Sequence, residues 1–149
     1  MHMPLKKLLL AASAVAVITV SVVIAQSAKT VWDGVYTQAQ AKRGTGLFTQ
    51  QCATCHGEDL KGKEDLKPDP APALTGSDLA IDFNDTPLGA LADRIRTSMP
   101  KDKPNTLSRE QVADLVSFIL SKNGMPAGKV DLPSAADGLA GITFLATKP

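Results

Sequence analysis

The stretch Cys52-Ala53-Thr54-Cys55-His56 places two thiols three positions apart, with an imidazole directly after the second thiol. This is the C-x-x-C-H pattern that is typical of covalent haem attachment. At the end of a helix, the two thiols can reach the two vinyl-derived carbons on one haem edge. The next residue then lies beneath the iron, where its imidazole can bind axially. The motif therefore predicts one covalently bound haem c, attached at Cys52 and Cys55 and ligated by His56.

Other interpretations of the cysteine pair fit the chain less well. Cys52 and Cys55 are the only cysteines, whereas an exported domain stabilised by disulfides usually has more. A thioredoxin-like redox pair follows a strand in a βαβ context, but the residues before Cys52 predict a helix. A structural zinc site needs four ligands, and beyond residue 25 only His56 is available to join the two thiols. A chance match to the motif is the remaining alternative.

The sixth ligand of the iron follows from a count of side chains. His2 lies in the N-terminal segment, so beyond residue 25 there is no second histidine, and the ligand is a methionine, a lysine, water or absent. Only Met99 and Met125 remain among the methionines. Met99 ends a predicted helix, precedes a proline and stands far enough after His56 for the chain to cross to the opposite haem face. Met125 follows the last predicted helix, where a methionine packs locally. We therefore expect Met99 as the ligand.

The first 25 residues differ in composition from the rest of the chain. Lys6 and Lys7 precede an uncharged apolar stretch at residues 8–25, and Val23 and Ala25 stand three and one positions before a suitable cleavage point. This pattern predicts a secretory signal peptide at residues 1–25 and a periplasmic location. The alternative is an uncleaved membrane anchor, because about 18 apolar residues is near the lower limit for spanning a bilayer.

Charge and length exclude some classes of protein. The chain has 149 residues and a formal net charge of +1, which falls to −1 when Lys6 and Lys7 are removed with the signal. No basic run remains, so nucleic-acid binding is not expected, and membrane association is expected only through an uncleaved N-terminal segment. We expect a lead-in at residues 26–37, one domain at residues 38–124 and a C-terminal tail at residues 125–149.

Helical patterns predict an all-α fold of three to four helices, without strands. Thr37 and Gln40 form a capping-box pattern ahead of a first helix at about residues 38–51. Ser108 and Gln111 form a second capping-box pattern ahead of the last helix, which ends at an Asn-Gly pair.

The middle of the chain predicts one long loop and one helix. Residues 57–85 are rich in Gly, Pro, Asp and Lys, which favours an extended loop. Thr86 and Pro87 suit the N-cap and the first position of a helix. Apolar residues then follow at helical spacing as far as Met99, where the next proline ends the helix.

The chain resembles class I c-type cytochromes over about residues 38–124. This resemblance implies a cytochrome c fold in which the first and last helices cross, with Gly44, Phe48 and Phe118 at the contact. It also implies that the carbonyl of Pro72 accepts the ring N–H of His56, which fixes the orientation and basicity of the imidazole. The matching positions are the C-x-x-C-H motif, Gly44, Phe48, Pro72-Ala73-Leu74, Met99-Pro100 and Phe118.

Reversible one-electron transfer is the activity expected from a His/Met-ligated haem. Two strong-field ligands saturate the iron, so neither redox state has to gain or lose a ligand, and the thioether raises the potential relative to two imidazoles. We expect an electron carrier and not an enzyme. The alternatives are a haem enzyme or gas sensor with an open sixth position, and a fixed haem subunit of a dehydrogenase or oxidase complex.

The partners are expected to be a redox-protein donor and acceptor. The lead-in at residues 31–37, Val-Trp-Asp-Gly-Val-Tyr-Thr, is similar to that of small cytochromes that accompany bacterial quinoprotein dehydrogenases. This similarity implies a quinoprotein dehydrogenase as one partner, with a terminal oxidase as another. Lys61 and Lys63 flank the attachment loop, and Lys101 and Lys103 follow the predicted ligand. These lysines either set the rate of partner association or are simply solvated loop residues.

Overall fold

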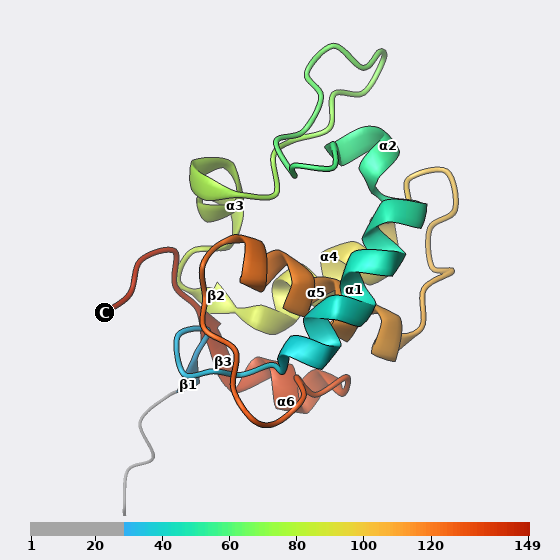
Figure 1. Cartoon of the computed structure of the whole chain (residues 1–149). Coiled ribbons are helices and arrows are strands. Elements are labelled where there is room, and N and C mark those ends of the chain that lie inside the picture. The colour runs from blue at the N-terminus through green and yellow to red at the C-terminus, as the bar shows by residue number, and fades with distance from the viewer. Residues whose placement is uncertain (1–28) are drawn as a thin grey trace, which may run out of the picture.

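The computed structural model describes residues 29–149, so the signal or anchor segment predicted at residues 1–25 lies outside the described residues. The all-α prediction is confirmed, although this part of the chain has more helices than the three to four expected, and it also has three short strands (Figure 1). The helices are α1 (Gln38–Gln51), α2 (Ala53–His56), α3 (Gly76–Phe83), α4 (Leu88–Ser98), α5 (Arg109–Lys122) and α6 (Ala136–Ala140). The strands are β1 (Lys29–Thr30), β2 (Thr86–Pro87) and β3 (Ile142–Phe144). None of the helices in residues 29–149 has the length and apolar character needed to cross a membrane.

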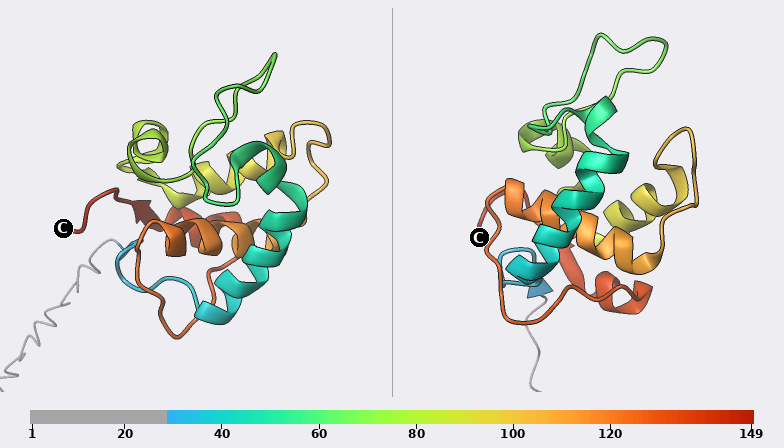
Figure 2. Two further views of the ribbon diagram at one scale, coloured as in Figure 1. Left: turned by 45° about the horizontal axis from the view of Figure 1, so that its top comes forward. Right: turned by 45° about the vertical axis from the view of Figure 1, so that its right-hand side comes forward.

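Helices α1 and α5 cross at the centre of the molecule (Figures 1 and 2). The backbones approach closely because Gly44 has no side chain: a Cβ there would collide with the carbonyl oxygen of Asp114 and lie 2.8 Å from the Cβ of Phe118. One turn further along α1, the rings of Phe48 and Phe118 pack with their centroids 5.0 Å apart. The contact implied by the resemblance is therefore confirmed.

Capping boxes were predicted at the starts of α1 and α5. The capping box of α5 is confirmed, whereas α1 has only one of its two hydrogen bonds. At α5, the Ser108 side chain accepts from the backbone N–H of Gln111, and the Gln111 side chain accepts from the backbone N–H of Ser108. At α1, the Thr37 hydroxyl accepts from the backbone N–H of Gln40 at 3.1 Å. The reciprocal bond of that capping box is absent from the described contacts, because the Gln40 side chain binds elsewhere.

The side chain of Gln40 joins the C-terminal segment to α1. It is 3% exposed, its Nε2 donates to the carbonyl of Leu132 at 3.0 Å, and its Oε1 accepts from the N–H of Leu132 at 2.6 Å. Nearby, the Arg43 guanidinium donates to Asp114 of α5 at 3.0 Å and to Asp131 at 2.9 Å. These contacts join α1, α5 and the chain near Leu132.

Replacing Gln40 with alanine is expected to lower the free energy of unfolding by about 2–4 kcal/mol, because the buried N–H and C=O of Leu132 lose their partner. Chemical denaturation of the haem-loaded protein measures this change. Gln38→Ala, at an exposed position of the same helix, is the control and should change stability by less than about 0.5 kcal/mol. Equal losses in the two variants would show that the Leu132 contacts do not stabilise the fold.

The two ends of the described chain meet in one small sheet. Its strand order is β1-β3-β2, with β1 parallel and β2 antiparallel to β3. Val31, Leu132, Ile142 and Phe144 are only 0–4% exposed and belong to the same core as the helices. The prediction that the chain has no strands is therefore wrong. Strands of two or three residues are too short to show an alternating pattern in the sequence.

The segment at residues 57–85 is not a loop throughout, which corrects the prediction. Residues 76–83 form α3, which buries Leu79 against the core. Residues 57–75 are irregular, as expected, and stand out from the body of the molecule beside α2 (Figures 1 and 2).

Helix α4 begins one residue later than predicted. Thr86 and Pro87 pair with β3 as β2, so α4 starts at Leu88. It ends before Met99, whose backbone is extended (φ −125°, ψ 148°), as expected for a residue that precedes proline. The predicted end of this helix is confirmed.

Candidate functional site

The C-x-x-C-H motif lies at the junction of α1 and α2. Cys52 ends α1, and its N–H donates to the carbonyl of Phe48 at 2.8 Å. The N–H groups of Cys55 and His56 both point to the carbonyl of Cys52, at 3.1 and 2.9 Å. Cys52 is half-buried, Cys55 is exposed, and both thiols are free. The backbone therefore fixes a turn that brings the two thiols and the imidazole to one end of α1.

His56 is buried, and one hydrogen bond orients its ring. Its Nδ1 lies 2.9 Å from the carbonyl oxygen of Pro72, the contact that the resemblance implied. A carbonyl oxygen only accepts, so Nδ1 is the donor of this bond, and in a neutral imidazole the lone pair then lies on Nε2. Among the side-chain hydrogen bonds of residues 29–149, the His56 ring makes this one, through Nδ1. An imidazole held in this way can offer Nε2 to a metal ion.

The position of Pro72 depends on the neck of the projecting loop. Lys63 and Ala71 form an antiparallel bridge with backbone hydrogen bonds of 2.9 and 3.1 Å. Gly62 lies at φ +75°, and its N–H donates to the carbonyl of His56 at 2.9 Å. A Cβ at Gly62 would collide with the carbonyl oxygen of Ala71 and lie 2.7 Å from the carbonyl carbon of Pro72. Glycine is therefore required for this close approach of the two sides of the loop.

The environment of Cys52 does not favour a thiolate. Burial raises the pKa of the Cys52 thiol to about 11, and the neighbouring Cys55 adds to this effect. Zinc binds deprotonated cysteines, and in the described part of the chain no three side chains of His, Cys, Asp and Glu gather closely enough to hold a metal ion. The arrangement of residues 29–149 therefore gives no support to a zinc site.

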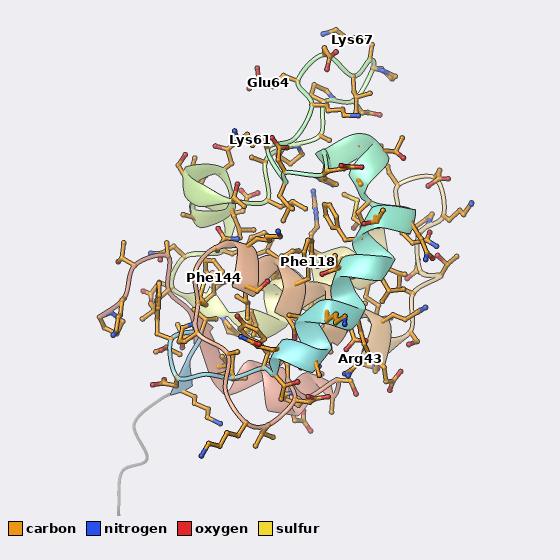
Figure 3. The ribbon with its side chains drawn as sticks, viewed as in Figure 1. Arg43, Lys61, Glu64, Lys67, Phe118 and Phe144 are labelled. Carbon is orange, nitrogen blue, oxygen red and sulfur yellow. The ribbon has the colours of Figure 1, made fainter. Side chains whose placement is uncertain are left out.

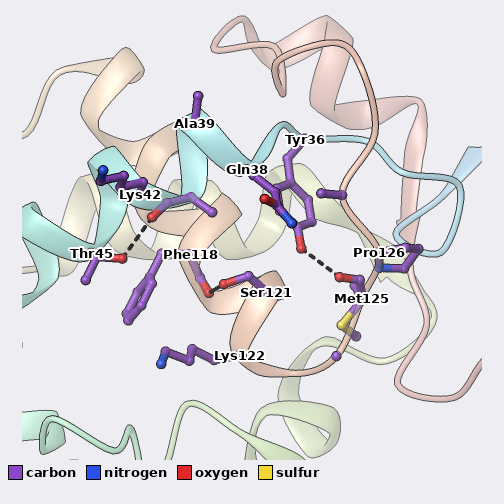
Figure 4. A pocket seen from close by; sticks show the side chains of 13 residues that line it. Tyr36, Gln38, Ala39, Lys42, Thr45, Phe118, Ser121, Lys122, Met125 and Pro126 are labelled. Atoms are coloured by element: carbon purple, nitrogen blue, oxygen red, sulfur yellow. Dashed lines mark hydrogen bonds between the residues drawn. The ribbon is translucent and has the colours of Figure 1, made fainter.

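The two candidate methionines lie in different surroundings. Met125 is 4% exposed, and its N–H donates to the carbonyl of Leu120 at 3.1 Å. Its own carbonyl accepts from the hydroxyl of Tyr36 at 2.6 Å (Figure 4). Met99 is partly exposed and begins the segment that leads from α4 to α5. Local packing of Met125, as expected for a residue that follows the last helix, is confirmed.

The four lysines singled out in the sequence all have acceptors, which sequence reasoning missed. As a result, the surface beside the motif carries both signs of charge and is not a basic ring. Figure 3 shows Lys61, Glu64 and Lys67 along the projecting loop. The contacts are Lys61–Asp59 at 3.8 Å, Lys63 Nζ to the Thr54 carbonyl at 2.7 Å, Lys101–Asp69 at 2.7 Å and Lys103–Asp102 at 4.0 Å.

Two pockets lie away from the motif. One, of about 710 Å³, lies between the start of α1 and the end of α5 and is lined by residues that include Tyr36, Lys42, Lys122 and Met125 (Figure 4). The other, of about 300 Å³, lies between α4, α5 and α6. Neither is lined by the two cysteines, the histidine, Pro72 or Met99.

Comparison with known families decides the class of protein. The model of the family described as "Cytochrome C oxidase, cbb3-type, subunit III" matches residues 39–119, which is more than half of the chain. The chain belongs to this family. It is a c-type cytochrome with the cytochrome c fold, and its cofactor is covalently bound haem c. The family given by the resemblance and the cofactor predicted from the motif are therefore confirmed.

Comparison with individual proteins adds one similarity. No curated protein matches this c-type cytochrome. Among solved structures, it is similar to a chain of the sulfane dehydrogenase SoxCD from Paracoccus pantotrophus, with 20% sequence identity and a TM-score of 0.48. The similarity covers 83% of this chain and 68% of that chain.

Proposed function

We propose that this c-type cytochrome is a one-electron carrier, with its haem attached to Cys52 and Cys55 and ligated by His56 and Met99. The hydrogen bond between His56 Nδ1 and the Pro72 carbonyl is the main support, because it leaves Nε2 as the ring nitrogen that can bind iron. Two free thiols beside this imidazole fit the two attachment points of haem c. The donor set present in the chain thus fits the cofactor.

The haem supplies an iron that takes up and releases one electron, and the protein residues hold it in a constant environment. The Pro72 carbonyl keeps the His56 ring in one orientation and raises its basicity. The thioether of Met99, a neutral and soft donor, would favour the reduced iron and raise the potential. Ligation by both His56 and Met99 would leave no open position on the iron for a substrate, which suits a carrier and not a haem enzyme or gas sensor.

We also propose that the protein is exported to the periplasm and exchanges electrons with other redox proteins. The N-terminal composition and the covalent attachment of the haem support export. A quinoprotein dehydrogenase is the donor suggested by the lead-in at residues 31–37, and a terminal oxidase is a second partner. A fixed place in an oxidase complex is the second candidate function, because the family description names an oxidase subunit. The protein could be purified from detergent-solubilised membranes. If no other chain stays bound to it, the second candidate is ruled out.

Carbon monoxide binding by the reduced protein tests the proposed function. An iron with two protein ligands should show little change in its absorption spectrum when carbon monoxide is added at neutral pH. Met99→Ala, which opens the sixth position, should form the carbon monoxide complex readily and serves as the positive control. Rapid formation of the complex by the unmodified protein would instead favour a gas sensor or haem enzyme.

Replacing Gly62 with alanine should raise the midpoint potential by tens of millivolts. The added Cβ displaces the loop at Pro72, weakens the bond to His56 and makes the imidazole a poorer donor to oxidised iron. Gly76→Ala is the control: Gly76 also has a positive φ, of +67°, but a Cβ there meets nothing within 4 Å. Redox titration measures both variants. Equal potentials in the two variants would argue against a role for the Pro72 carbonyl.

A further inference from the structure

The projecting loop and the segment after Met99 meet in an ion pair. Lys101 Nζ lies 2.7 Å from Oδ2 of Asp69. Lys101 follows Met99 by two residues, and Asp69 precedes Pro72 by three. One partner is therefore close in sequence to the proposed methionine ligand, and the other is close in sequence to the residue whose carbonyl orients the proposed histidine ligand.

We propose that the Lys101–Asp69 ion pair positions Met99, by holding the segment that starts at Met99 against the loop at residues 57–75. This inference rests on the proposed function, since it assigns a positioning role around the proposed axial ligand. Lys101 and Asp69 themselves would not touch the iron. The ion pair would change the fraction of molecules in which the Met99 side chain is not bound to the iron.

The loop that carries Asp69 is itself anchored close to the motif. The bridge between Lys63 and Ala71 closes its neck, and the Lys63 ammonium donates to the carbonyl of Thr54 in α2 at 2.7 Å. Asp69 therefore stands on a support that is fixed to the helix bearing the motif. The ion pair with Asp69 therefore restrains the position of Lys101 relative to this loop.

The segment that carries Lys101 is fixed at its start by the end of α4. The N–H of Met99 donates to the carbonyl of Ile95 at 3.0 Å, and the N–H of Lys103 donates to the carbonyl of Pro100 at 2.9 Å. The ion pair formed by Lys103 stays within its own turn, at 4.0 Å from Asp102. Among the ion pairs of the loop lysines in residues 29–149, only that of Lys101 joins two separate segments.

Both partners are exposed, which limits the size of the effect. The side chains of Lys101 and Asp69 are 66% and 58% exposed. Exposed ion pairs change an equilibrium by about two- to fivefold, and salt screens them. The pair therefore adjusts the population of the displaced methionine and does not by itself create the ligation.

Imidazole binding to the oxidised, haem-loaded protein tests this inference, because imidazole binds only when the native sixth ligand leaves. Lys101→Gln should bind imidazole about two- to fivefold more tightly than the unmodified protein at low salt, and the difference should shrink at high salt. Lys103→Gln is the matched control, since it removes the same charge from the same segment, and it should bind imidazole unchanged. The double variant with Lys101→Asp and Asp69→Lys should restore the original affinity.

Two results would overturn the positioning role. One is equal imidazole affinity in Lys101→Gln and Lys103→Gln, and the other is failure of the charge-exchanged variant to restore the affinity. Thermal unfolding of the same variants should show little change, which separates positioning from general stability. Failure of the proposed function looks different: the unmodified protein would lack the sulfur-to-iron absorption band and would bind imidazole as tightly as Met99→Ala.

Discussion

Replacing Gly44 with alanine is expected to lower the free energy of unfolding by about 3 kcal/mol or more, a loss at the upper end for single substitutions. The added Cβ would collide with the backbone carbonyl of Asp114 and lie 2.8 Å from the Cβ of Phe118. A backbone group cannot rotate away as a side chain can, so α1 and α5 must move apart. Their separation would also weaken the packing of the Phe48 and Phe118 rings.

Gly46→Ala is the matched control for this prediction. Gly46 lies two residues further along α1, and a Cβ there meets nothing within 4 Å. Alanine inside a helix is more favourable than glycine, so this variant should gain about 0.5–1 kcal/mol. Denaturant unfolding of the haem-loaded variants measures both changes. A gain in stability in both variants would show that helix propensity, and not the crossing of α1 and α5, determines the result.

Replacing Met99 with alanine is expected to abolish the sulfur-to-iron absorption band and to lower the midpoint potential by about 0.1 V or more, since axial ligands strongly set haem potentials. Water or an added ligand would then take the sixth position. Absorption spectroscopy of the oxidised protein and a redox titration provide the two measurements. An unchanged band in this variant would mean that Met99 is not a ligand.

Met125→Leu is the control for the methionine variant. Met125 is buried, and its backbone binds Leu120 and Tyr36. Leucine has a similar volume, so the substitution should cost less than about 1.5 kcal/mol of stability. The absorption band and the potential should both stay as they are. Loss of the band in Met125→Leu would show that Met125, and not Met99, is the ligand.

The parts of the fold that could be predicted are those whose signals are local. The caps at Thr37 and Ser108 act within one turn of the chain, so the starts of α1 and α5 are visible in the sequence. The stop before Pro100 is equally local. In contrast, Gln40 has a capping-box position but binds Leu132, which lies far along the chain. No nearby residue in the sequence indicates that the Gln40 side chain binds Leu132 and does not complete the capping box.

The same distinction applies to the candidate site. The two thiols and the imidazole lie within five consecutive residues, so the motif alone indicates their chemistry. The acceptor for His56 could be named only through the family resemblance, because its bond to Pro72 spans a long loop. The lysines were visible, but their acceptors, three carboxylates and one backbone carbonyl, were not assigned. Lys101 and Asp69 lie on two separate loop segments, and no sequence pattern predicts that these segments meet.

The central claim is that Cys52 and Cys55 attach one haem covalently to this chain. Mass spectrometry of the purified protein after denaturation, followed by digestion, tests it most directly. The claim predicts that the chain keeps the added mass of one haem and that the mass stays with the peptide containing Cys52 and Cys55. A chain that loses all haem on denaturation, or that carries it on a different peptide, would contradict the claim.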